Sequence, residues 1–234
     1  RSGFKVLGAT LLGLALIVIV GLVSLSHGPG RQLATALVDG RTINAVGTVS
    51  LSDLEGDILS DFRIGTLTLT DTQGVWLEAE EVHVTWRARS LLGSTVQIEA
   101  IEAASITVLR RPDLEREPSS GEGGGKGVSL NGLMITDLFL EEPVLGEQAA
   151  LRAEASLTST PTDGQTVSAE IVRTDGAADR LIAEFTRSAL GEIEGRLSAQ
   201  ADANSPLAQL AYATGRGFTL DADISGDAQS GAAD

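Results

Sequence analysis

The sequence predicts a mainly β fold, in which one N-terminal transmembrane helix precedes an elongated, curled, antiparallel or meandering β-sheet. Three observations predict it: an apolar run near the start, a period-two alternation of apolar and polar residues beyond it, and turn-forming clusters between the alternating stretches. The chain of 234 residues has room for one or two domains, and no second apolar run is long enough to cross a membrane. We expect a fragment of a longer repetitive β protein.

The apolar run covers residues 6–25 and is interrupted only by Thr10 and Ser24. As a helix it would span about 30 Å, the thickness of one bilayer core. Because Arg1 and Lys5 precede it, we expect the start of the chain to stay in the cytoplasm and the body to be exported. The residues that represent this anchor are Val6, Leu12, Leu16, Val20 and Leu25.

A cleaved signal peptide is the alternative for the same run. Ser24, Leu25 and Ser26 form a small-x-small pattern that a signal peptidase accepts. The run is longer than the usual cleavable segment, which favours an anchor that stays in place. Both interpretations deliver the body across the membrane.

The chain divides into six expected regions. These are a cytoplasmic tip at 1–5, the transmembrane anchor at 6–25, a stem at 26–40, an N-terminal β unit at 41–111, a flexible linker at 112–128 and further amphipathic strands, forming an incomplete unit, at 129–234. The linker is expected from its proline, charge and glycine content, with almost no apolar residues.

Alternation identifies the strands of the body. From Leu151 to Thr158, every second residue is apolar and those between are polar, which is typical of a strand with one solvent-exposed face. Between residues 75 and 86 the alternation slips by one residue after Glu80 and Glu81, which indicates a β-bulge. A further strand, of roughly 45 Å if continuous, places six apolar residues on one face, with a break near Ala103 left open. Those residues are Val96, Ile98, Ala100, Ala104, Ile106 and Val108.

Composition excludes several function classes. The formal net charge of −15 disfavours nucleic acid and anionic lipid head groups as partners. The chain has no cysteine and only His27 and His83, too few to build a thiolate or histidine-rich metal site. We expect no metal, no cofactor and no catalytic residue, and therefore no enzyme.

Two motifs that suggest chemistry fail on closer inspection. The segment GEGGGKG invites a phosphate-loop interpretation, but Ser120 and Gly127 stand where that motif requires Gly and Ser or Thr. Carboxylates such as Glu78, Glu80 and Glu102 alternate onto polar faces, so solvated charge explains them better than a glycosidase pair.

The apolar face of the strands is the remaining candidate site. It could close against a second sheet as a core, or it could stay open as a trough for acyl chains. The candidate groove residues are Leu67, Leu69, Leu77, Val82, Val84, Trp86, Val96, Ile98, Ile106 and Val108.

The stretch from Leu51 to Pro112 resembles the opening of TamB proteins, in the wider group that includes AsmA. The resemblance depends on the order of several short motifs. These are Leu-x-Gly at 54–56, Ile-x-x-Leu-x-Leu at 64–69, Asp-x-x-Gly-x-Trp-Leu at 71–77, Val-x-Val-x-Trp at 82–86, Leu-Leu-Gly at 91–93, Ile98 with Ile101, and Arg111 with Pro112. It covers the first half of the chain, and the second half only by its repetitive β character.

The resemblance implies an inner-membrane protein with a periplasmic body, built as an open, elongated β structure, called a β-taco, with a hydrophobic interior. It further implies a role in outer-membrane protein translocation and assembly and in phospholipid transport between the two membranes. The implied partners are phospholipid acyl chains, the inner membrane and an outer-membrane barrel protein of the TamA type. The alternative is a membrane-anchored structural or adhesive β domain with a closed core.

Overall fold

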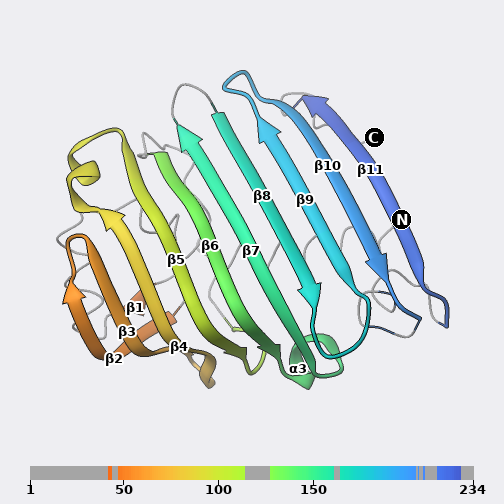
Figure 1. Ribbon diagram of the computed structural model, residues 1–234, viewed down its shortest axis with the longest axis horizontal. Helices are drawn as coiled ribbons and strands as arrows, with labels where there is room; N and C mark the ends of the chain where they lie inside the picture. The colour runs from red at the N-terminus through yellow and green to blue at the C-terminus, as the bar shows by residue number, and fades with distance from the viewer. Residues whose placement is uncertain are drawn as a thin grey trace.

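The strands of the protein form one sheet. The computed structural model describes residues 42–43, 47–113, 127–160, 164–203, 205, 208 and 215–227, and all strands in these ranges belong to a single eleven-stranded sheet (Figure 1). The order of the strands across the sheet follows their order along the chain. The expected mainly β, mostly antiparallel fold is therefore confirmed.

The sheet contains strands of very different lengths, and two short helical segments connect some of them. The strands are β1 (Thr42–Ile43), β2 (Gly47–Asp57), β3 (Asp61–Asp71), β4 (Gly74–Arg87), β5 (Thr95–Val108), β6 (Gly127–Leu140), β7 (Ala149–Thr160), β8 (Gly164–Arg173), β9 (Arg180–Arg187), β10 (Glu192–Ala201) and β11 (Phe218–Asp227). The helical segments are the 3-10 turn η2 (Ala88–Leu92) and the single α-helical turn α3 (Glu142–Leu145).

One pair of strands departs from the expected antiparallel pattern. β5 and β6 are parallel, with Val96 opposite Val128 and Val108 opposite Leu140, while the other neighbours are antiparallel. Parallel neighbours need a connection that returns to the starting end, so residues 109–126 join opposite ends of the sheet. Of the linker expected at 112–128, residues 114–126 lie outside the described ranges and β6 begins at Gly127. The strands on both sides of it share one sheet.

The expected tip, anchor and stem, residues 1–40, also lie outside the described ranges. Within those ranges, no helix combines the length and the apolar character needed to cross a bilayer.

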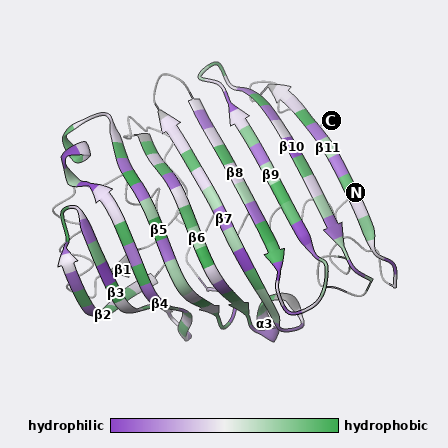
Figure 2. Cartoon of the chain, in the orientation of Figure 1, coloured by the Kyte–Doolittle hydropathy of each residue, from purple (hydrophilic) through white to green (hydrophobic). Residues whose placement is uncertain are grey.

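The period-two phase is unbroken from β7 to β11. Along β7, Leu151, Ala153 and Leu157 are buried, whereas Arg152 and Glu154 are exposed. Figure 2 shows the resulting bands of hydrophobic and hydrophilic residues along the strands. Because successive side chains of a strand point to opposite faces, one face of this part of the sheet is apolar and the other polar.

Alternation breaks in β4, where the sequence indicated a bulge. Glu81 has a φ of 50°, in the left-handed region, and buried Ala79 and Val82 lie on either side of it. On β3 the matching residue is Gly65, because Ile64 pairs with Val82 and Thr66 with Glu80. The predicted slip is therefore confirmed, but both strands slip together and their register is kept.

The same slip crosses five neighbouring strands at one level. We call this line the phase break; its residues are Asp53, Gly65, Glu81, Ala104 and Thr136, one each from β2 to β6. Asp53, like Glu81, has a positive φ, of 53°. At β7 the extra residue is absorbed, because Thr136 and Asp137 face Arg152 alone.

The phase break corrects the expectation for residues 96–108. β5 is continuous, but Ala103 is buried on the apolar face and Ala104 is exposed. Ala100 was expected on the apolar face, but it pairs with Thr85 on the polar face, whereas its neighbour Ile101 pairs with Val84 on the apolar face. The cause is Glu99, an extra residue of β5 that has no backbone pairing partner on β4 and shifts the alternation by one residue.

Replacing Glu81 with Asn should stabilise the protein. Asn tolerates the left-handed conformation better than Glu, so Glu81→Asn should raise the free energy of unfolding by about 0.5–1 kcal/mol. Glu80→Asn, at the adjacent exposed position without a positive φ, is the control and should give no gain. Equal effects at both positions, measured by urea unfolding, would contradict the phase break.

Candidate functional site: the apolar face of the sheet

Cross-strand pairing aligns apolar side chains into continuous rows. One row crosses ten strands, from β2 to β11, and consists of Leu54, Ile64, Val82, Ala103, Ile135, Ala153, Ile171, Leu181, Ala199 and Leu220. A second row, from β4 to β11, consists of Trp86, Ile98, Leu130, Leu157, Val167, Phe185, Gly195 and Ile224. Together such rows make one apolar face over nearly the whole sheet.

In the second row, a neighbouring side chain fills the space beside the glycine. A Cβ at Gly195 would clash with Cδ1 of Phe185, so the aromatic ring lies directly against this backbone. Only glycine allows this approach, and the ring keeps the row apolar where a side chain is missing.

All ten groove residues expected from the sequence lie on this face. Five are buried, with exposed fractions between 4% and 8%: Leu77, Val82, Val96, Ile98 and Val108. The other five are partly buried and pack against the same core: Leu67, Leu69, Val84, Trp86 and Ile106. The ten residues therefore share one face, and their role in binding acyl chains stays a prediction.

The face extends much further than the ten groove residues. It continues through β6, where Leu130, Ile135 and Leu138 are 1–3% exposed, and on to β11. β6 lies mostly within the region where strands were expected, but its individual residues were not predicted, because two irregularities, at 131–132 and 136–137, interrupt its alternation. Its spacing of apolar residues, two apart and then three apart as in β4, was the signal that could have found it.

The exposure of the face changes across the sheet. From β4 to β7 many of its side chains are buried, whereas on β8 to β10 the side chains of Val167, Ile171, Leu181, Phe185 and Leu197 are only half-buried. Ile224, on the edge strand β11, is 40% exposed. The part of the face nearest β11 is thus accessible to an apolar ligand.

The opposite face carries charges in cross-strand pairs. Arg87 Nε lies 2.6 Å from Glu99 Oε1, and Arg180 Nη2 lies 2.7 Å from Glu170 Oε1. These side chains are 38–65% exposed, so each pair contributes little to stability. Their effect is to keep this face hydrated.

His83 lies on the charged face between two carboxylates. Its Nε2 is 2.9 Å from Asp61 Oδ1 and its Nδ1 is 4.0 Å from Glu102 Oε2. Both ring nitrogens thus face acceptors rather than a nucleophile, an arrangement that does not support acyl transfer. Within the described ranges, no set of three or more His, Cys, Asp or Glu side chains is arranged to hold a metal ion.

A buried ion pair joins the turn between β3 and β4 to the end of β5. The side chain of Asp71 is 1% exposed; it accepts hydrogen bonds from both terminal nitrogens of Arg110, from Asp113 N at 2.6 Å and from Gln73 N at 2.8 Å. Hydrogen bonding by Arg110 holds the pKa of Asp71 well below its usual range. The same arginine also donates to Gly74 O at 2.7 Å.

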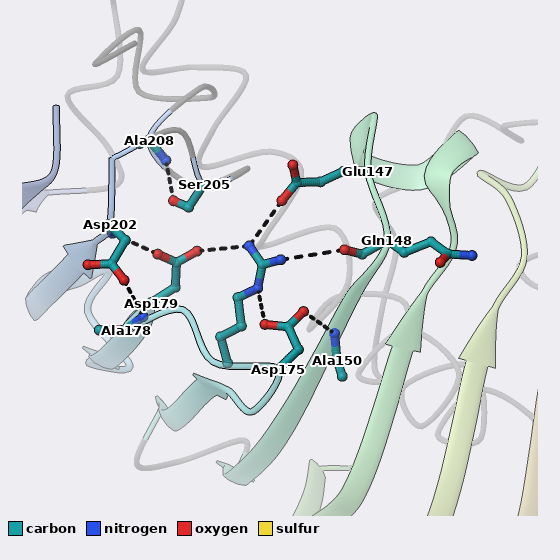
Figure 3. Close-up of polar contacts among 10 residues, drawn as sticks. Glu147, Gln148, Ala150, Asp175, Ala178, Asp179, Asp202, Ser205 and Ala208 are labelled. Carbon is teal, nitrogen blue, oxygen red and sulfur yellow. Dashed lines mark hydrogen bonds and ion pairs between the residues drawn. The ribbon is translucent and has the colours of Figure 1, made fainter. Parts of the chain in front are cut away.

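A second network centres on Arg173, at the end of β8 (Figure 3). The guanidinium, in a side chain only 10% exposed, contacts Asp175 at 2.6 Å, Glu147 at 3.1 Å and Asp179 at 3.6 Å. It therefore joins the β6–β7 connection to the β8–β9 connection. Hydrogen bonding by Arg173 lowers the pKa of Asp175.

The network continues to the end of β10. Asp179 accepts a hydrogen bond from Asp202 N at 2.9 Å, and the Asp202 carboxylate accepts one from Ala178 N at 2.7 Å (Figure 3). These contacts hold three connections together at one end of the sheet. Their role is to fix the ends of the strands that carry the apolar face.

Comparison of the chain with protein-family models, curated proteins and solved structures found no match. What the apolar face can bind must therefore be argued from its own residues.

Arg173→Met should destabilise the protein by about 3 kcal/mol, because it leaves the buried Asp179 carboxylate without its cation. Arg196→Met is the matched control: Arg196 is 72% exposed and pairs with Asp223, which is 84% exposed, so its loss should change stability by less than about 0.5 kcal/mol. Thermal unfolding followed by circular dichroism measures both. Equal losses would contradict the burial of the Arg173 network.

Acid should weaken the fold through Asp71 and Asp175. Their pKa values are lower in the folded state than in the unfolded chain, so their stabilising effect is complete well above the unfolded value of about 4 and is lost progressively as the pH falls from that value toward the lower folded pKa. Asp71→Asn should be less stable at pH 7 and show a shallower loss between pH 5 and pH 2. Asp223→Asn should keep the slope of the unmodified chain, and urea midpoints across that range test both outcomes.

Proposed function

We propose that the protein is an inner-membrane-anchored periplasmic scaffold whose apolar sheet face solvates the acyl chains of phospholipids. The observation that carries this proposal is the ten-strand row of aliphatic side chains, in which Ile171, Leu181 and Leu220 of the β8–β11 portion are only partly buried, although Ala199 is 2% exposed. Leaving a fatty chain in water costs about 0.8 kcal/mol per methylene, or on the order of 12 kcal/mol for sixteen carbons. A continuous apolar face offsets much of that cost.

Two sequence features support the proposed location. Residues 6–25 have the length and apolar character of an anchor, and the two basic residues before them favour export of the body. The net charge of −15 and the charged outer face favour solubility and disfavour adhesion to anionic lipid head groups. Lipid would then contact the apolar face rather than the outer face.

The resemblance of residues 51–112 to TamB proteins extends the proposal. By that resemblance the chain belongs to a longer β-taco protein that takes part in outer-membrane protein assembly and in phospholipid transport between the membranes. Its outer-membrane partner would be a barrel protein of the TamA type. No enzymatic activity is proposed.

A structural or adhesive domain with a closed core is the second candidate. It is favoured by the low exposure of the face between β4 and β7, where Trp76 is fully buried and Leu130 is 1% exposed. In this case the face would be the protein's own core rather than a binding surface.

Photocrosslinking in living cells distinguishes the two functions. A photoreactive amino acid at Leu197, which is half-buried on the apolar face, should form lipid adducts, whereas one at Arg196, exposed on the opposite face, should form few. The adducts are identified by mass spectrometry. Intramolecular protein crosslinks from Leu197 without lipid would instead indicate a closed core and refute the lipid proposal.

A further inference from the structure

Three leucines are far more exposed than the other large apolar side chains of the described residues. The exposed fraction is 92% for Leu92, 76% for Leu190 and 60% for Leu59, whereas the remaining exposed members of this class range from 36% to 42%. Each of the three lies in a tight connection between consecutive strands: β2–β3, β4–β5 and β9–β10. Exposing such side chains to water is unfavourable, so their position needs a reason.

All three connections lie at the same end of the sheet, which we call the leucine end. β2, β4 and β9 run in the same direction, and each leucine follows the last residue of one of them. Figure 1 shows these connections along one edge, opposite the edge that carries α3. The buried networks of Asp71 and Arg173 occupy that opposite edge, where the most exposed large apolar residues of the described ranges are Phe139, at 40%, and Val75, at 36%.

The leucine end is continuous with the apolar face. Ile58 and Leu91, each directly before an exposed leucine, pack against the buried core. The Trp86 indole N–H donates to Ile58 O at 2.9 Å, and Ser90 Oγ receives the N–H of Gln97 at 2.8 Å. These contacts fix the turns, in which Leu59 and Leu92 remain exposed to solvent.

The spacing and charge of the end indicate what it binds. The connections of Leu59 and Leu190 are separated by several strands, roughly 30 Å at the usual strand spacing. A row of single side chains so widely spaced suits a broad apolar layer better than a pocket on a protein. Exposed charges of both signs flank the leucines, with Arg89 and Arg187 positive and Asp57 and Glu192 negative. Such a mixed border suits zwitterionic head groups, whose phosphates the arginines can pair with while the leucines enter the acyl region.

We propose that the leucine end docks on a phospholipid bilayer by inserting Leu59, Leu92 and Leu190 below the head groups. This inference deepens the proposed function and rests on it: docking would bring the apolar face into contact with the acyl layer, so that a lipid could move between them without crossing water.

The absence of cysteine makes a direct test possible. Leu59→Cys, Leu92→Cys and Leu190→Cys are prepared singly in the full chain, labelled with an environment-sensitive fluorophore and reconstituted into phosphatidylcholine vesicles that contain brominated phospholipid. Docking predicts a blue-shifted emission and quenching by the brominated acyl chains at all three positions. Val75→Cys, at the opposite end, is the matched control and should be quenched only by aqueous iodide.

Independent substitutions test whether the leucines cause the docking. With the label at position 92, the double variant Leu59→Ser, Leu190→Ser should lose bromolipid quenching, whereas Met134→Ser, on the charged face, should leave it unchanged. The far-ultraviolet circular dichroism of each variant confirms that the sheet is formed.

Several outcomes would overturn the inference. Iodide quenching at all labelled positions would show that none of them enters the bilayer. Equal bromolipid quenching at position 75 would show that insertion is not specific to the leucine end. Contact quenching between labelled chains, without bromolipid quenching, would show that the end binds a second copy of the chain instead. The two proposals can fail separately. Lipid adducts at Leu197 without insertion at the leucine end would refute only the docking proposal, and insertion without adducts would refute only the proposed acyl-binding function of the face.

Discussion

The fold depends on one constraint, which is that neighbouring strands must stay in phase. Side chains alternate between faces with a period of two, so one unmatched extra residue would turn all later apolar side chains of a strand to the wrong side. β2 to β6 each carry an extra residue at the same level, and the apolar rows therefore remain continuous across the phase break. The irregularity ends as a true bulge of β6 against β7, and the strands after it keep one period-two phase.

The continuity of the rows explains both the stability and the chemical character of the sheet. Each aliphatic side chain has apolar neighbours on adjacent strands, and this cross-strand packing is the main stabilising unit of a sheet. The polar networks lie at one end, where Arg110 and Arg173 neutralise buried carboxylates in the connections. The proposed function therefore rests on an apolar surface of the described residues.

Much of the fold could be predicted because alternation is a local signal. The strict pattern of residues 151–158 predicted β7, and the spacing around Glu81 predicted a loss of phase, although β3 and β4 keep their register where a bulge was expected. The ten groove residues share one face. The failures have the same origin. The individual residues of β6 were not predicted, and Ala104 was placed on the wrong face, because a period-two test fails across a phase break whose compensating residues lie on other strands.

The sequence by itself determined the strand character of the body, its acidity, the lack of cysteine and the apolar side chains that form one face. These properties follow from residue type and from spacing within a single strand. Only the tertiary structure decided that β5 and β6 pair in parallel, that five irregular residues align, and that three leucines from distant turns lie at one end. Such relations depend on which strands become neighbours and in what register, which is set by the packing of residues far apart in the chain.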